Sequence, residues 1–204
     1  MARLFPIFVK LYDRPVLVVG AGTIAEQKIR GLLETGARIR VVALQAGAVV
    51  HEWAEAGRIM LEERAFSPTD LEGRFLVIAA TASSEANQSI FVEARGRGVL
   101  CNVVDVPEQC DFFYPAVVQR GDLQIAISTA GQSPSLAQRL RQQLERQFGP
   151  GYEEWVARLG ETRREVLDSR LSPERKRCLL RALASREAFE AALARQIQAG
   201  EKAS

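Results

Sequence analysis

Short apolar runs alternate with helix-like patterns through the first hundred residues. Residues 16–19 are all apolar, as expected of a strand buried on both faces of a sheet. In residues 24–34 apolar side chains recur every three or four positions, which predicts a helix, and Gly36 follows where that helix would end. Further strands are predicted at 39–43, 60–61, 75–80 and 100–104, and further helices at 48–56 and 85–95. Strands alternating with helices indicate an α/β fold with a doubly wound parallel sheet.

The pattern changes after residue 112. Two β-rich runs, 116–119 and 123–128, are separated by a short polar segment containing glycine, which predicts a hairpin. Ser133 followed by Pro134 predicts a capped helix start, and the chain beyond is helical in character. The sequence therefore predicts three parts, which are a sheet domain at 1–112, a small α+β segment at 113–148 and a helical domain at 149–204.

Composition and charge exclude several classes of protein. Hydrophobic residues make up 47% of the chain, and 27 basic residues nearly balance 25 acidic ones, so we expect a globular protein that binds neither nucleic acid nor an anionic membrane. No apolar run approaches the roughly 20 residues of a membrane span. We therefore expect a cytoplasmic protein.

The charge is distributed unevenly between the two parts of the chain. Residues 1–112 hold 12 Lys and Arg against 14 Asp and Glu, a net charge of −2, whereas residues 113–204 hold 15 against 11, a net charge of +4. The second part would suit an anionic small molecule. A solvated, arginine-rich helix surface gives the same pattern.

Few residues in the sequence are available for metal or acid–base chemistry. The three cysteines lack paired spacing and are interpreted as free thiols. The single histidine, His51, lies in a predicted surface helix, where a solvated role is expected. A histidine-dependent triad and a multi-histidine metal site are therefore excluded, no metal site is predicted, and any acid–base chemistry falls to carboxylates.

A glycine motif lies between the first predicted strand and helix. Gly20, Gly22 and Ala25 form a G-x-G-x-x-A sequence, in which the first glycine permits a tight turn, the second admits a pyrophosphate and the alanine allows close helix–strand contact. The N-terminus of the helix would offer free N–H groups to the phosphates. The motif predicts dinucleotide binding, with a structural glycine turn as the alternative.

The acidic residue that usually ends the second strand of such a site is absent. The chain there ends in Leu44 and Gln45, so Gln45 or backbone groups would hold the ribose. Arg38 or Arg40 could meet a 2′-phosphate. This part of the sequence leaves the choice between NAD and NADP open.

Asp105 follows the fifth predicted strand. Ligands of open parallel sheets bind beyond the carboxyl ends of the strands, where this carboxylate could accept a proton or briefly hold a metal ion. An Asx turn before Pro107 is the alternative.

The polar loop at 128–135 could bind an anion at the N-terminus of the next helix, or it could simply cap that helix. Arg139 and Arg141 follow in the same helix.

These elements together resemble the siroheme synthase N-terminal family, which comprises precorrin-2 dehydrogenases and sirohydrochlorin ferrochelatases. The resemblance covers about residues 4–148, in order and at family-like spacing. The helical tail is less distinctive. The matching segments are FPIF at 5–8, VVGAG at 18–22, AEQK at 25–28, AAT at 79–81 with Asn87, CNVVD at 101–105, ISTAG at 127–131, and SP at 133–134 with the leucines and arginines that follow.

The resemblance implies a fold, a reaction and partners. It implies a Rossmann-like domain that binds NAD, followed by a dimerisation segment and a helical tail that helps enclose a tetrapyrrole, in a homodimer. Precorrin-2 would lose a hydride to NAD⁺ and become sirohydrochlorin, and in some members Fe²⁺ is then inserted to give siroheme. The chain resembles a stand-alone form without the methyltransferase module of fused siroheme synthases.

The family's functional positions carry over residue by residue. The family's important aspartate matches Asp105, interpreted as catalytic. Where the family has two serines in the middle loop, this chain has Ser128 and Thr129, so regulatory phosphorylation of the second position is not expected to carry over unchanged. The expected cofactor contacts are Gly20, Gly22, Thr23, Ile24, Leu44, Gln45 and Thr81, and the expected substrate contacts are Asn102, Ser128, Thr129, Arg139 and Arg141.

Two alternatives to this function remain from the sequence. One is a dehydrogenase without physiological chelatase activity. The other is a non-enzymatic dimer that senses NAD(H), although such a module has no need of Asp105. An ordinary dehydrogenase of a small substrate is disfavoured because the chain lacks the catalytic histidine or the Tyr/Lys pair that alcohol chemistry usually employs.

Overall fold

The computed structural model describes the backbone of residues 3–201 and side chains as far as Ala194. The chain divides into two compact units, Met1–Tyr114 and Pro115–Ser204. In the described part, no helix is long and apolar enough to cross a membrane. The three-part division expected from the sequence stays a prediction.

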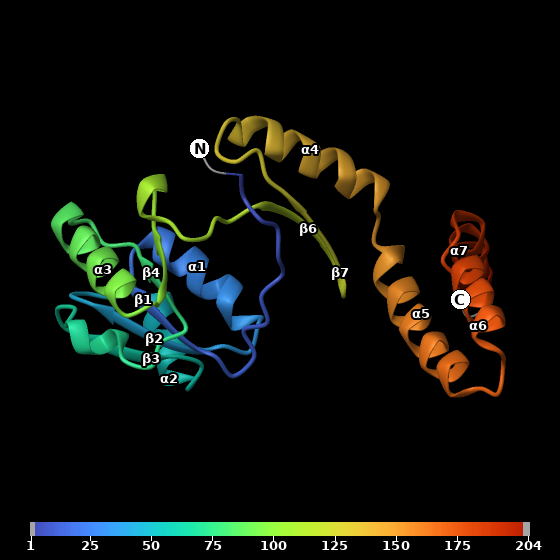
Figure 1. Cartoon of the computed structure of the whole chain (residues 1–204), viewed down its shortest axis with the longest axis horizontal. Coiled ribbons are helices and arrows are strands. Elements are labelled where there is room, and N and C mark those ends of the chain that lie inside the picture. Colours follow the sequence, from blue (N-terminus) through green and yellow to red (C-terminus); the bar gives the residue numbers. More distant parts are fainter. Residues whose placement is uncertain (1–2, 202–204) are drawn as a thin grey trace. The chain divides into compact units, whose positions relative to one another are not determined.

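A five-stranded parallel sheet forms the centre of the first unit (Figure 1). The strand order is β3-β2-β1-β4-β5. The direction of winding reverses between β1 and β4, so the doubly wound, Rossmann-like fold predicted from the sequence is confirmed. The strands are β1 (Pro15–Val19), β2 (Arg38–Ala43), β3 (Met60–Glu63), β4 (Leu76–Ala79) and β5 (Leu100–Val103).

Side chains from the two faces of the sheet belong to two buried clusters. One contains Val16 and Val41 together with Ile29 of α1 (Thr23–Leu33) and Trp53 of α2 (Ala48–Glu55). Full burial of an aliphatic side chain of this size contributes about 1.5–3 kcal/mol, so such clusters fix the sheet between its helices.

The other cluster contains Leu17 and Val77 together with Ile90 of α3 (Ser84–Gly96). Because successive strand residues alternate between the clusters, the strands are apolar without interruption. Trp53 and Cys101 are both buried and so belong to the packed interior.

Two short 3₁₀ helices were not predicted from the sequence. The first, η1 (Pro68–Leu71), begins with a capping box between Ser67 and Asp70. The second, η2 (Pro107–Gln109), follows β5. Each helix starts with proline, whose fixed φ favours a turn. Both helices are too short to produce a periodic apolar pattern in the sequence.

The second unit begins with the predicted hairpin. Strands β6 (Ala116–Arg120) and β7 (Leu123–Ile127) pair antiparallel through a turn in which Gly121 has a φ of +53°. The helix α4 (Pro134–Gln147) starts as predicted, because the Ser133 side chain accepts a hydrogen bond from the backbone N–H of Leu136.

Three further helices complete this unit: α5 (Gly151–Asp168), α6 (Pro173–Leu183) and α7 (Arg186–Glu201). Tyr152 packs against Trp155 of the same helix and against Phe189 of α7, with ring centroids 5.6 and 4.2 Å away. Trp155 therefore takes part in an aromatic cluster that joins α5 to α7. The three free cysteines are confirmed, with Cys178 of α6 exposed.

Candidate active site

The carboxyl edge of the sheet carries the candidate site. The Gly20 N–H, just past β1, donates to the Val42 carbonyl of β2 at 2.8 Å, and the Ala80 N–H, just past β4, donates to the Val19 carbonyl of β1, also at 2.8 Å. The loops that leave β1 and β4 therefore start side by side, at the point where the direction of winding reverses. This is where open parallel sheets bind ligands.

The first glycine of the motif is required by its neighbours. Gly20 has a φ of +109°, and a Cβ added there would lie 2.3 Å from the Ala80 carbonyl oxygen. Only glycine fits that backbone and that contact. Ala25 is fully buried, so its small side chain brings α1 onto the sheet, as the motif predicts.

The second glycine lies beside open space at the start of α1. Gly22 is the N-cap of α1 and offers no capping side chain, while a Cβ there would meet nothing within 4 Å. Thr23 and Ile24 follow at the exposed first turn. The N–H groups of that turn and the partial positive charge of the helix suit a pyrophosphate, so these residues fit a dinucleotide.

The loop after β4 is fixed by Thr81 and Asn87. The Thr81 hydroxyl donates to the Asn87 Oδ1 at 2.8 Å, and the Asn87 Nδ2 donates back to the Thr81 carbonyl at 3.1 Å. Thr81 thus lies at the predicted edge, and its side chain is already engaged within the loop. Asn87 was missed as a site residue, although the motif that marked Thr81 contained it.

Leu44 and Gln45 are exposed at the carboxyl end of β2, with Leu44 76% exposed. The loop they form is tied to the end of β3, because the Ala46 N–H donates to the Glu63 Oε1 at 3.0 Å. The other oxygen of Glu63 lies 3.2 Å from the His51 Nε2.

Neither arginine considered for a 2′-phosphate lies at this loop. Arg38 is the first residue of β2, at the opposite edge of the sheet, where it pairs with Asp13 at 3.0 Å. Arg40 pairs with Glu62 and lies 3.6 Å from the buried Asp70. The interpretation of Arg38 and Arg40 as 2′-phosphate ligands is therefore wrong, because strand position and ion pairing hold both away from Gln45.

Asp105 lies just past the carboxyl end of β5. Its backbone has a φ of +60°, in the left-handed region that Asp tolerates better than most residues, and its side chain is exposed. No hydrogen bond to its carboxylate occurs within the described chain, so the Asx turn considered as an alternative does not form here. The carboxylate is thus presented at the edge and available to a ligand.

Lys28 of α1 brings a positive charge towards this carboxylate. Its Nζ lies 3.7 Å from the centre of the Tyr114 ring, a cation–π contact. Partial burial lowers the pKa of Lys28, and the charge of Asp105 raises it in part. The family resemblance included Lys28 in its segment at 25–28, but nothing in the apolar pattern separated it from an ordinary helix lysine.

The loop that carries Asp105 is held from inside. Asn102 is buried, and its Nδ2 donates to the Phe112 carbonyl at 2.8 Å. The Cys110 thiol donates to the carbonyls of Val103 at 3.2 Å and Val106 at 3.3 Å. Asn102 was expected to contact substrate; its placement supports a structural role, so the contact stays a prediction.

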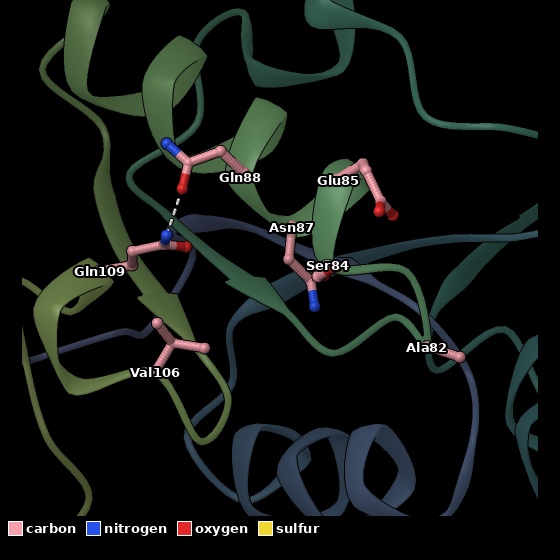
Figure 2. A pocket seen from close by; sticks show the side chains of 7 residues that line it. All are labelled: Ala82, Ser84, Glu85, Asn87, Gln88, Val106 and Gln109. Atoms are coloured by element: carbon pink, nitrogen blue, oxygen red, sulfur yellow. Dashed lines mark hydrogen bonds between the residues drawn. The ribbon is translucent and has the colours of Figure 1, made fainter.

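A cavity of about 530 Å³ lies at the same edge, between α3 and η2 (Figure 2). The side chains of Gln88 and Gln109 face one another there and are hydrogen-bonded. No lysine or arginine lines it, so it suits a neutral polar group better than a carboxylate. The lining residues are Ala82, Ser84, Glu85, Asn87, Gln88, Val106 and Gln109.

The remaining predicted residues lie in the second unit. Ser128 is exposed, and its hydroxyl accepts a hydrogen bond from the Ala130 N–H, while the Thr129 hydroxyl accepts one from the Ser133 N–H, both at 3.1 Å. Arg139 is exposed. Arg141 pairs with Glu145 one helical turn on. The loop at 128–133 is therefore organised by its own hydrogen bonds, and its substrate contacts stay predictions.

Two family models match the chain. One, described as NAD(P)-binding, covers residues 7–116, and another, described as sirohaem biosynthesis protein central, covers residues 120–147. The prediction of a dinucleotide cofactor is thereby confirmed at the level of an NAD(P)-binding domain. No group of three or more potential metal ligands occurs within the described residues.

Several known proteins are similar to the chain. A siroheme synthase of Methylococcus capsulatus is 45% identical over 140 residues, which are 69% of this chain and 30% of the relative. One from Methylobacillus flagellatus is 36% identical over 97% of this chain and 41% of the relative. A solved structure named SirC, precorrin-2 dehydrogenase, is 31% identical with a TM-score of 0.81, covering 91% of this chain and 92% of that one. The chain thus spans about a third of the length of the curated relatives it matches.

Proposed function

Because the chain belongs to the siroheme synthase N-terminal family, we propose that it is an NAD-dependent dehydrogenase that oxidises precorrin-2 to sirohydrochlorin. One observation carries this proposal. The open N-terminus of α1 at Gly22 and the exposed carboxylate of Asp105 lie at the same edge of one sheet. A cofactor and an acid–base group can therefore serve the same reacting molecule.

The residues of this edge have separate tasks. Gly20, Gly22, Thr23 and Ile24 would hold the pyrophosphate, and Leu44 and Gln45 the adenosine ribose. Thr81 would contact the cofactor through the loop that Asn87 fixes. The amide-rich cavity beside Gln88 and Gln109 suits the carboxamide of a nicotinamide.

Asp105 is the proposed general base. Oxidation of precorrin-2 removes two hydrogen atoms, which amount to two electrons and two protons. NAD⁺ takes both electrons and one of the protons as a hydride. The remaining proton must leave the macrocycle, and an exposed carboxylate at the sheet edge can accept it. Lys28 brings a positive charge that suits a substrate carboxylate, since the substrate carries eight of them.

The remaining substrate contacts are proposed from the family resemblance alone. Asn102 of the first unit, with Ser128, Thr129, Arg139 and Arg141 of the second, is carried over from the family resemblance. Charged guanidinium groups bind carboxylates strongly, which supports the two arginines. A homodimer is proposed on the same resemblance. So is a second reaction, in which Fe²⁺ is a substrate that is inserted into sirohydrochlorin while Asp105 accepts the pyrrole protons.

The decisive experiment supplies enzymatically made precorrin-2 with NAD⁺ and follows the absorption spectrum. We expect sirohydrochlorin and NADH to form together, and neither to form when protein or NAD⁺ is omitted. Binding of NAD⁺ with no change in precorrin-2 would contradict the proposal and favour a non-enzymatic, NAD(H)-sensing dimer.

Chelation requires a separate test. Fe²⁺ or Co²⁺ is added to preformed sirohydrochlorin with and without the protein, and the rate of metal insertion is compared. If the protein does not raise the rate of metal insertion, chelation is rejected and a dehydrogenase without chelatase activity is favoured.

A further inference from the structure

The adenosine half of the proposed cofactor site lacks its usual acid. In dinucleotide-binding sheets a carboxylate at the end of the second strand binds the ribose 2′-hydroxyl and disfavours a 2′-phosphate. Here β2 ends at Ala43 and is followed by the neutral residues Leu44 and Gln45. The structure nevertheless brings a carboxylate to this point from another strand.

Glu63 is the last residue of β3, and in the parallel register it is the partner of Ala43. Its Oε1 accepts the Ala46 N–H at 3.0 Å, so this oxygen lies one residue from Gln45 along the loop. The side chain is 44% exposed and therefore accessible to a ligand at the sheet edge.

The same carboxylate organises the loop. His51 lies 3.2 Å from the second oxygen of Glu63 through Nε2, and 3.2 Å from the Gly47 carbonyl through Nδ1. These contacts connect the end of β3, the loop after β2 and the first turn of α2. The neighbouring Glu62 does not share this role, because it pairs with Arg40 and Arg64.

We propose that Glu63 supplies from β3 the carboxylate missing from β2, so that it positions the Leu44–Gln45 loop and its charge makes the site select NAD⁺ over NADP⁺. This inference rests on the proposed function, because it requires that the site bind a dinucleotide. The phosphate group of NADP⁺ carries close to two negative charges near neutral pH, so a carboxylate next to the ribose repels it.

The charge of His51 opposes this effect when the imidazole is protonated. Its hydrogen bond to Glu63 raises the pKa of His51 above the ordinary value, while the same bond lowers the pKa of Glu63. Glu55 lies near enough to raise the pKa of His51 further. Binding is therefore measured at alkaline pH, because loss of the His51 proton leaves the carboxylate charge uncompensated.

The experiment measures the dissociation constants of NAD⁺ and NADP⁺ by titration calorimetry on the full chain. Glu63→Gln removes the charge but keeps an oxygen that can accept the Ala46 N–H. We expect this variant to bind NADP⁺ about tenfold more tightly than the unaltered protein, with NAD⁺ affinity changed less than about threefold. Glu63→Ala also removes the hydrogen bond, so it should weaken NAD⁺ binding as well.

Glu34→Gln is the matched control. Glu34 is exposed and caps the C-terminal end of α1, away from the cofactor edge, and its substitution changes the net charge by the same amount. The ratio of the two affinities should not change in this variant. A change equal to that of Glu63→Gln would mean that net charge alone acts, and would overturn the proposal.

Two other results would also overturn the proposed role of Glu63, and only the second would overturn the proposed function as well. If the unaltered protein binds both dinucleotides and Glu63→Gln leaves their ratio within about twofold, the role of Glu63 fails while the proposed function stands. If the unaltered protein binds neither dinucleotide, the proposed function fails and the role of Glu63 fails with it.

Discussion

Gly20 and Gly22 stand two residues apart, yet a methyl group at each would meet different surroundings. At Gly20 it would collide with the Ala80 carbonyl on a backbone of positive φ, whereas at Gly22 it would enter open space. The first glycine is therefore needed by the fold itself. The second is needed only by whatever approaches the helix.

Paired alanine substitutions test this distinction. Gly20→Ala should lower the free energy of unfolding by about 2–4 kcal/mol, because strain and a backbone collision add. Gly22→Ala should cost less than about 1 kcal/mol but weaken NAD⁺ binding at least about tenfold, because its methyl group occupies the space for phosphate. Urea unfolding and binding titrations measure the two effects. Equal losses of stability would refute the distinction.

Asp105 offers a clean chemical substitution. Asparagine has the same shape and adopts the left-handed backbone at least as readily as aspartate, so Asp105→Asn changes the charge without changing the conformation. We expect turnover of precorrin-2 to fall at least about 100-fold while the dissociation constant of NAD⁺ stays within about twofold. Single-turnover absorbance and binding titrations check this. Unchanged sirohydrochlorin formation would remove Asp105 from the mechanism.

At the scale of elements, the loop after β5 combines chemistry and support. Asn102 and Cys110 hold it from inside while Asp105 faces outward. Asn102 is buried within the strand, Asp105 is exposed just beyond it, and Cys110 is partly buried further along the loop. Support and function thus alternate within a few residues.

Thiol reactivity reports whether this loop stays closed. Burial raises the pKa of Cys101 to about 12 and also raises the pKa of Cys110, so both stay protonated and slow to react near pH 8. Cys178 is exposed and should react first with a disulfide reagent. We expect one fast thiol in the folded protein and three in denaturant, with the fast phase lost in Cys178→Ser. A second fast thiol in the folded protein would show that the loop opens.

The sequence predicted the elements that have a strong periodic pattern or a specific cap. The strand at β1, the hairpin and the helix capped by Ser133 lie where their patterns placed them. Glu63 was missed because the predicted strand was given as residues 60–61, two residues short of it. Glu63 meets the loop at Ala46, which lies 17 positions earlier in the chain, because of the register between β2 and β3. Local sequence patterns do not contain strand register.

At the scale of the whole molecule, the hairpin of the second unit is where we expect self-association. Its sheet has only two strands of five residues each, and within the described chain no third strand covers either edge. The unpaired N–H and C=O groups along such open edges can pair with a strand of another chain. A second copy of the chain is the proposed partner.

Light scattering behind size-exclusion chromatography tests that proposal. The expected mass is twice the chain mass of 22.5 kDa. Because association follows mass action, the measurement is repeated down to about 1 µM protein. A mass equal to one chain throughout would reject the homodimer.

The boundary between the units also separates opposite charges. Residues 113 and 114 are uncharged, so the unit that ends at Tyr114 carries a net charge of −2 and the following unit +4. A substrate with eight carboxylates should be drawn towards the second unit during diffusion, an attraction that dissolved ions screen. We expect kcat/KM for precorrin-2 to fall as ionic strength rises while kcat changes little, measured by initial rates over a salt series. A value of kcat/KM that does not change with salt would mean that the separation of charge does not guide the substrate to the protein.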